Sequence, residues 1–222
     1  MKKRSFVVVG LGTFGTMVAS ELCRYGNPVL VIDIDEKRVS PFAETAREAI
    51  IADGREEAAL REAGVGDYDV AVVGIGEDLE ANILCTMNVK MLGVKTIWAK
   101  ASNRTHHRIL AKLDIDRIIL PEQETGRHVA QMLNFPLMRD FINMGNGFSL
   151  INLMVPDVLT GKTVSELPMH VDENLRVLGA MRGTAHIDCT DGTARLEKGD
   201  RLFVLGRRAG LEKFIGSLPG GR

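Results

Sequence analysis

Residues 5–36, SFVVVGLGTFGTMVASELCRYGNPVLVIDIDE, decide the fold. They begin with a short apolar run, 6–9, of the kind found in strands that are buried on both faces. A Gly-x-Gly-x-x-Gly turn and an amphipathic segment, 16–25, follow, and a second apolar run, 29–32, leads into Asp33. The order strand, glycine-rich turn, helix, strand and acid predicts a nucleotide-binding βαβ unit.

Each residue of the glycine-rich turn has a predicted task. Gly10 permits the tight turn out of the strand, Gly12 leaves room for a pyrophosphate close to the backbone, and Gly15 lets the helix pack close to the sheet. Thr13 and Phe14 complete the loop, and the helix N-terminus offers free N–H groups to phosphates. Glycines also mark ordinary turns, so a purely structural turn is the alternative.

Apolar runs and helical segments continue to alternate along the chain. Strands are predicted at 49–52, 69–73, 96–99 and 117–120, and helices at 35–46, 56–63, 78–92 and 103–113. Six strands alternating with helices indicate an α/β fold, a Rossmann-like doubly wound parallel sheet with the strand order 3-2-1-4-5-6. We assign residues 1–133 to this nucleotide-binding domain and expect its ligand at the carboxyl ends of the first and fourth strands.

Residues that follow the predicted strands should share one edge of the sheet. The residues at these positions are Gly10, Asp33, Asp53, Gly54, Gly74, Ile75, Gly76, Lys100 and Glu122. Asp35, close to Asp33 in the chain, is a further candidate. Asp33 can accept hydrogen bonds from ribose hydroxyls, and its charge would repel a 2′-phosphate, so NADP is the least expected dinucleotide. Asp53 and Gly54 either contact the nucleobase or ribose or form a simple turn. Lys100 is either a phosphate ligand or a solvated charge.

The pattern changes after a helical segment at 126–132. Residues 134–147, NFPLMRDFINMGNG, contain a proline, two glycines and apolar residues that need burial, namely Phe135, Leu137, Met138, Phe141 and Ile142. We interpret this stretch as a helical linker that packs against another subunit and so serves in dimerisation. Residues 148–222, with strands at 148–155, 175–181 and 201–205 and a helix at 210–218, predict a smaller α+β domain dominated by antiparallel strands.

Composition narrows the function classes. The net charge of −1 gives no electrostatic argument for a nucleic-acid partner, and no apolar stretch approaches the roughly 18 residues of a membrane span, so we expect a cytoplasmic protein. The three scattered cysteines fit small buried hydrophobes better than a metal site.

An NAD-dependent oxidoreductase needs an acid or base from the second half of its site. The histidines, including the adjacent His106 and His107, fit surface or capping roles better than catalytic ones. A non-enzymatic binding protein is therefore our first interpretation. A small NAD-dependent oxidoreductase is the alternative, and a structural domain that has lost its ligand is a third.

The series GLGTFG, VIDID, ADG, VVGIG, WAKASNRTHH and DRIILPEQETG resembles the RCK (KTN) domain, and NLRVLGAMRG with LEKGDRLFVLG resembles the RCK C-terminal subdomain. RCK domains are the cytosolic nucleotide-sensing subunits of Trk/Ktr-type potassium uptake systems and the gating modules of potassium channels. The resemblance covers nearly the whole chain. It implies a separate regulatory subunit, peripheral to the inner face of the cell membrane, whose partner is a membrane potassium-translocating subunit.

The same resemblance implies ATP/ADP or NAD(H) as the ligand. It also implies that subunits form dimers through the helix after the sixth strand and that these dimers assemble into octameric rings. By position, the resemblance implies that the phosphate loop consists of Gly10, Gly12, Phe14 and Gly15. It implies that Asp33 binds the ribose and that Asp53 lies near the base. It also implies that Lys100 and Glu122 lie near the phosphates. A divalent cation held with the nucleotide phosphate would bind at Glu122. Ktr-type members that use ATP often have arginine where this chain has Thr13, which leaves NAD(H), ADP and AMP open.

Overall fold

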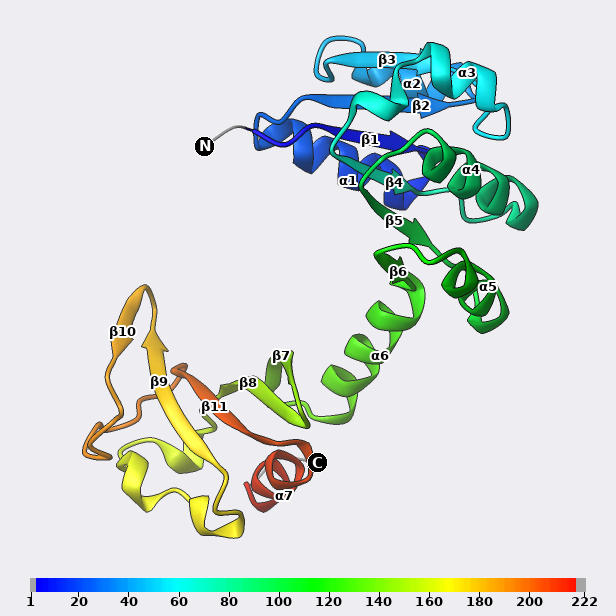
Figure 1. Ribbon diagram of the computed structural model, residues 1–222. Helices are drawn as coiled ribbons and strands as arrows, with labels where there is room; N and C mark the ends of the chain where they lie inside the picture. Colours follow the sequence, from blue (N-terminus) through cyan, green and yellow to red (C-terminus); the bar gives the residue numbers. More distant parts are fainter. Residues whose placement is uncertain (1–2, 219–222) are drawn as a thin grey trace. The chain divides into compact units, whose positions relative to one another are not determined.

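The computed structural model describes residues 3–218 and consists of two compact units (Figure 1). The chain passes from the first unit to the second between Glu124 and Thr125. This division lies inside the helix α6 (Pro121–Asn134), earlier than the boundary after residue 133 that the sequence suggests. Within residues 3–218, no helix combines the length and the apolar character that crossing a bilayer requires.

The first unit contains a six-stranded parallel sheet in the order β3-β2-β1-β4-β5-β6, which confirms the predicted doubly wound topology. Its strands are β1 (Phe6–Val9), β2 (Val29–Asp33), β3 (Glu48–Ile51), β4 (Val70–Val73), β5 (Thr96–Lys100) and β6 (Arg117–Ile119). Its helices are α1 (Thr13–Arg24), α2 (Glu36–Val39), α3 (Glu57–Glu62), α4 (Leu79–Met91) and α5 (Arg104–Leu110), with the 3₁₀ turns η1 (Ser40–Phe42), η2 (Val65–Asp67) and η3 (Ala111–Leu113).

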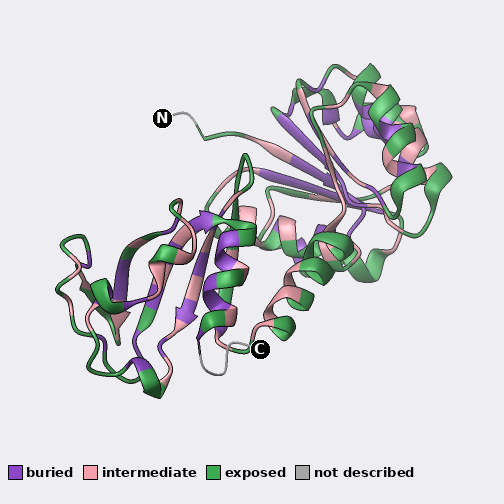
Figure 2. Ribbon diagram, turned by 90° about the horizontal axis from the view of Figure 1, so that it is seen from below, coloured by how far each residue is buried: buried purple, intermediate pink, exposed green. Residues whose placement is uncertain are grey.

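Apolar side chains cover both faces of this sheet. Val7 and Val9 of β1 belong to the cluster that α3, α4 and α5 complete, whereas Val8 belongs to the cluster on the opposite face, with Ala19 of α1. Figure 2 shows these strands as a buried layer among partly exposed helices. Because the sheet is packed from both sides, the positions of the strand ends, and of the residues that follow them, are well fixed.

The predicted helix over 35–46 is only partly correct. The α-helix α2 ends at Val39 and continues as the 3₁₀ turn η1, which contains Pro41. A proline has no backbone N–H to donate within a helix, and its ring clashes with the preceding turn, so the α-helix cannot continue through this position.

The predicted helical linker over 134–147 is wrong. Helix α6 ends at Asn134, and the next regular element is the strand β7 (Met138–Gly145), which pairs antiparallel with β8 (Phe148–Met154). Asn146 and Gly147 form the two-residue turn between them, with φ of +51° and +79°. Positive φ at both central positions matches an Asn-Gly turn whose twist fits a hairpin, and this local preference overrides the helical interpretation.

The second unit is the expected small α+β domain. Its antiparallel sheet has the order β10-β9-β11-β8-β7, with the further strands β9 (Arg176–Arg182), β10 (Ala185–Ile187) and β11 (Arg201–Arg207). Helix α7 (Arg208–Ser217) buries Leu211, Phe214 and Ile215 against one face of this sheet. The 3₁₀ turns η4 (Asp157–Leu159), η5 (Val164–Glu166) and η6 (Met169–Val171) lie between β8 and β9 in the chain.

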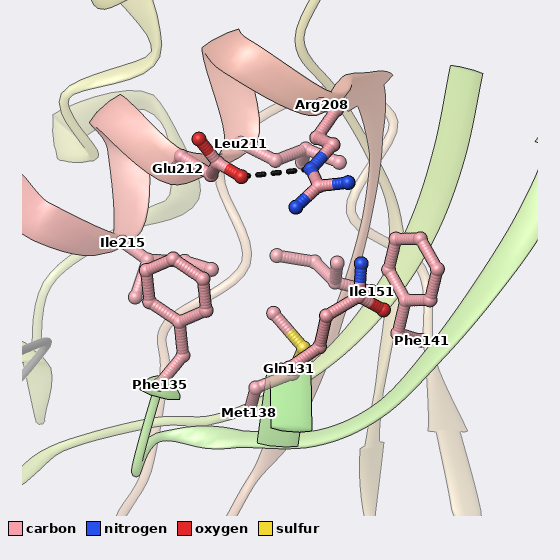
Figure 3. Close-up of a pocket in the computed structure, with 9 residues that line it drawn as sticks. All are labelled: Gln131, Phe135, Met138, Phe141, Ile151, Arg208, Leu211, Glu212 and Ile215. Carbon is pink, nitrogen blue, oxygen red and sulfur yellow. Dashed lines mark hydrogen bonds and ion pairs between the residues drawn. The ribbon is translucent and has the colours of Figure 1, made fainter. Parts of the chain in front are cut away.

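Most apolar residues of 134–147 pack within their own unit. Phe135, Met138 and Phe141 line a pocket of about 20 Å³ between α6, β7, β8 and α7, beside Ile151 and Leu211 (Figure 3). A cavity of this size holds roughly one water molecule. The expectation that these side chains need another subunit for burial is therefore wrong for Met138, which is buried, whereas Phe135 and Phe141 are partly buried within the unit.

Candidate functional site

A cleft of about 250 Å³ lies at the carboxyl ends of β1, β2, β3 and β4. The predicted site residues that line it are Gly10, Asp33, Asp53, Gly54 and Ile75. It is also lined by Val9, Ile34, Arg38, Ala52, Arg55, Asp78 and Ala81. The lining therefore combines apolar walls with a few charged groups, as small-molecule sites commonly do.

The turn after β1 is held by close backbone packing. Gly10 has φ of +92°, and a Cβ added to it would lie 2.7 Å from the backbone nitrogen of Ile75. A Cβ on Gly15 would lie 1.9 Å from the carbonyl oxygen of Gly10, and one on Gly74 would lie 2.7 Å from the same oxygen. These positions exclude larger residues for reasons of packing, so the tasks predicted for Gly10 and Gly15 agree with the geometry.

Gly12 differs, because a Cβ placed on it would meet no atom within 4 Å. Gly12 is the N-cap of α1, where no side chain caps the helix and no acid lies in the first turn. In contrast, side chains cap α2, α4 and α5, through Asp35, Asp78 and Asn103 respectively. The first-turn N–H groups of α1 and its positive dipole end are thus available to an anion such as a phosphate.

The two remaining loop residues are placed differently from one another. Thr13 is an exposed residue and the first residue of α1. Phe14 is partly buried and packs against the apolar cluster beside α1. The Phe14 ring therefore supports the loop from the core side, and only its backbone N–H belongs to the anion-binding turn.

Asp33 is buried, with 6% of its surface exposed, and it holds the loop in place. Its Oδ2 accepts a hydrogen bond from the N–H of Leu11 at 2.6 Å, and its Oδ1 accepts one from the N–H of Asp35 at 2.9 Å. The guanidinium of Arg38 lies 3.8 Å from Oδ2. An ionised carboxylate has about four acceptor sites, so Asp33 can still accept from ribose hydroxyls. Asp35 is occupied as the cap of α2, through the N–H of Lys37.

Asp53 forms a two-point ion pair with Arg55, with 2.6 Å between Oδ2 and the nearer terminal nitrogen. Hydrogen bonds from the Arg55 side chain lower the pKa of Asp53, despite the opposing effect of its partial burial. Arg38 and Arg55 also line the cleft, and sequence reasoning missed both of them. Arg55 follows Asp53 by two residues and Arg38 follows Asp33 by five, and these positions after strand-end acids were the available signal.

Lys100 and Glu122 are not among the residues that line the cleft, and they form an ion pair with 2.6 Å between Nζ and Oε1. The Lys100 side chain is largely buried, and its hydrogen bond lowers the pKa of Glu122. A Cβ on Gly76 would lie 2.8 Å from Nζ, so this glycine makes room for the lysine. Across residues 3–218, no group of three or more His, Cys, Asp or Glu side chains is arranged to hold a metal ion, so a cation at Glu122 would need phosphate oxygens as well.

His106 is fully buried, which corrects the expected surface or capping role. Its Nε2 lies 3.0 Å from Oδ1 of Asn82, another fully buried polar residue. No local signal in the sequence marks this contact, because the two residues come from different helices, α4 and α5.

Comparison with known proteins agrees with the fold. The family models for the TrkA-N domain and the TrkA-C domain match residues 6–121 and 150–218. The chain is 37% identical to the "Ktr system potassium uptake protein A" of Vibrio alginolyticus, over 97% of this chain and 98% of that protein. It is 31% identical to the "Ktr system potassium uptake protein C" of Bacillus subtilis, over 96% of each. These relatives are named for potassium uptake and not for an enzymatic activity, which disfavours the oxidoreductase alternative.

Solved structures share the fold at low sequence identity. The "GsuK channel bound to NAD" has a TM-score of 0.67 and 14% identity, covering 98% of this chain and 40% of that chain. The "Crystal Structure of the GsuK RCK domain" gives a TM-score of 0.66 and 14% identity, covering 98% and 49%. Both domain models and the full-length relatives lead to the same assignment. The chain belongs to the TrkA family of RCK-domain proteins, which includes the Ktr system potassium uptake proteins A and C.

Proposed function

We propose that this protein is the nucleotide-sensing regulatory subunit of a potassium uptake system. It would act in the cytoplasm, at the inner face of the cell membrane, on a membrane potassium-translocating subunit. Membership of the TrkA family supports this role. The observation that carries the nucleotide part is the start of α1, where an uncapped helix N-terminus at Gly12 adjoins a cleft with a buried acid, Asp33.

The ligand we propose is an adenine nucleotide, ATP/ADP or NAD(H). Its phosphates would bind the first-turn N–H groups of α1, its ribose would donate to Asp33, and its base would lie near Asp53 between the apolar Ile34 and Ile75. The GsuK channel, which shares the fold, has been solved bound to NAD, and this is compatible with the same class of ligand.

Discrimination among these nucleotides should be weak without a metal. Lys100 is already paired with Glu122, and Thr13 supplies a hydroxyl where an arginine would supply a charged, two-point contact. A γ-phosphate would meet the carboxylate of Glu122 unless a divalent cation lies between them. We therefore expect magnesium to favour ATP more than ADP.

Regulation requires assembly, and we propose a dimer formed through α6 and β7 that builds an octameric ring. Helix α6 has no buried residue, and its Val129 and Leu133 are 41% and 78% exposed. Ile142 and Met144 of β7 are 51% and 58% exposed. Nucleotide binding would shift the ring between conformations of different nucleotide affinity, and the membrane partner would respond to that shift.

The experiment that tests this function is a titration of ADP, ATP and NADH by calorimetry, followed by a turnover assay. A regulatory subunit should bind one or more of these nucleotides with micromolar affinity and should not oxidise or reduce NAD(H) with any 2-hydroxy acid or aldehyde supplied. Absence of binding to all three nucleotides would favour a domain that has lost its ligand, and sustained turnover would favour an oxidoreductase.

A further inference from the structure

We propose that Asn82 is a positioning residue of the nucleotide site, and that its side-chain amide couples the cleft to the start of α6. This inference rests on the proposed nucleotide binding and extends it to the route by which ligand state reaches the second unit. Asn82 lies near the start of α4 and is fully buried. Burying an amide side chain costs free energy unless its polar groups are hydrogen-bonded, so the partners of Asn82 account for its place here.

The Asn82 amide bridges the ends of two strands. Its Nδ2 donates to the carbonyl oxygen of Ile75, just after β4, at 2.6 Å and to that of Lys100, at the end of β5, at 3.0 Å. The ladder between β4 and β5 ends at the pair Val73 and Ala99. Beyond that pair, the amide of Asn82 continues the connection between the two strand ends.

His106 fixes the orientation of this amide. The N–H of Ser102 donates to Nδ1 of His106 at 3.2 Å, so Nε2 carries the proton and donates to Oδ1 of Asn82 at 3.0 Å. Burial lowers the pKa of His106, which keeps the ring neutral at physiological pH. With Oδ1 directed at His106, both amide hydrogens must face the two carbonyl groups.

Each end of the bridge meets a different part of the protein. Ile75 lines the cleft and packs against Gly10, where the anion-binding turn begins. Lys100 forms its ion pair with Glu122 in the first turn of α6, the helix that leads out of the first unit. A ligand that moves the Gly10 turn therefore displaces Ile75, and the shared amide passes that displacement to Lys100 and α6. Such a contact chain is a route for coupling only if changing it alters the coupling.

Hydrogen exchange, followed by mass spectrometry with and without saturating ADP in the absence of metal, tests the inference. In the wild-type protein, ADP should slow hydrogen exchange in the turn at 10–16. It should also slow exchange in the first turn of α6, by at least about fivefold. Asn82→Ala leaves space in which a water can bond to both carbonyls, so the protein should fold without the fixed bridge. In this variant ADP should still protect residues 10–16, while the response of α6 is lost.

Thr86→Val is the matched control. Thr86 is a fully buried residue of the same helix, and its hydroxyl donates to the backbone carbonyl of Asn82 at 2.7 Å. The substitution removes one buried hydrogen bond and leaves the Asn82 side chain intact, so both ADP responses should persist. His106→Leu frees the amide to rotate and should act in the same direction as Asn82→Ala.

The outcomes separate the inference from the proposed function. A wild-type response of α6 that survives in Asn82→Ala or in His106→Leu would overturn the coupling role. Protection of residues 10–16 without any response of α6 in the wild-type protein would overturn it too, whether or not a variant folds. If ADP protects neither segment in the wild-type protein, the proposed nucleotide site itself fails, and the inference fails with it.

Discussion

Replacing Gly12 with valine should separate ligand binding from folding. A Cβ at this position meets no atom within 4 Å, and the backbone has φ of −64° and ψ of −176°, a conformation open to any residue. Valine is a poorer N-cap than glycine, so the free energy of unfolding should fall by only about 1 kcal/mol. The valine side chain would, however, occupy the space that a phosphate needs to reach the first-turn N–H groups.

The size of the effect follows from the hydrogen bonds that the phosphates could no longer accept. A hydrogen bond to a charged group contributes about 1.5–3 kcal/mol, so removing two of them weakens nucleotide binding by about 3–6 kcal/mol, more than roughly a hundredfold. Calorimetric titration with ADP measures the affinity, and urea unfolding without ligand measures the stability. An affinity for ADP within threefold of the wild-type value would refute the assignment of the phosphates to this turn.

Gly15→Ala is the opposite case and serves as the control. Its Cβ would lie 1.9 Å from the carbonyl oxygen of Gly10, which is backbone and cannot move aside freely. This variant should lose about 1–3 kcal/mol of stability before any ligand is added. The pair therefore distinguishes a glycine needed for the ligand from a glycine needed for the fold.

Four further predictions concern other parts of the molecule. Asp33→Ala leaves the buried N–H of Leu11 without its acceptor, so calorimetry and urea unfolding should both show losses of about 1–3 kcal/mol. Leu133→Asp places a charge on the exposed apolar side of α6 and should convert the assembly to smaller species, which light scattering would measure. An unchanged mass would exclude this side of α6 from the subunit interface. Without metal, the wild-type protein should bind ATP no more than about tenfold tighter than ADP, and Thr13→Arg should raise that ratio in competitive titrations. Burial lowers the pKa of His106 below its ordinary 6.5, so the unfolded chain takes up a proton at a higher pH than the folded protein does. The free energy of unfolding should therefore decrease below about pH 6.5 and then level off. Urea titrations between pH 5 and 8 should show this slope in the wild-type protein and not in His106→Leu.

The sheet of the first unit was predictable because its signals are local. The four-residue strand β1, the glycine-rich turn and Asp33 follow one another within a short stretch, and each apolar run is bounded by a turn residue. Parallel strands with helical crossovers then leave few possible topologies. The positions of Gly10, Asp33 and Asp53 at one edge of the sheet were predictable for the same reason, because residues after parallel strands share that edge.

Other features depend on contacts between residues that lie far apart in the chain. The stretch 134–147 has apolar residues that suit either a helix or a strand, and only the Asn146-Gly147 turn distinguishes the hairpin. The sequence around Phe141 suggests a need for a partner subunit, because the helix α7 that covers this residue lies far along the chain. Ile142, on the same strand but half exposed, is therefore the better probe of a subunit interface than Phe141.

The charged groups around the cleft also depend on contacts between residues that the sequence does not place together. Arg38 and Arg55 resemble ordinary solvated charges in sequence; their positions after strand-end acids are a weak signal, and the fold shows that both line the cleft. Asn82 and His106 lie on different helices, so their buried contact requires the tertiary structure. Sequence patterns thus located the edge of the sheet where the cleft lies, whereas the arginine, asparagine and histidine contacts around it depend on tertiary packing.

Nucleotide state should control potassium transport through this subunit. The most direct measurement is potassium flux into liposomes that contain the membrane potassium-translocating subunit, with this protein added in the presence of ATP, ADP or NADH. We predict that flux depends on which nucleotide is present with the wild-type protein and becomes independent of nucleotide with Gly12→Val, although that variant remains folded. A flux that is the same with every nucleotide, under conditions where calorimetry shows that the wild-type protein binds them, would contradict this regulatory role.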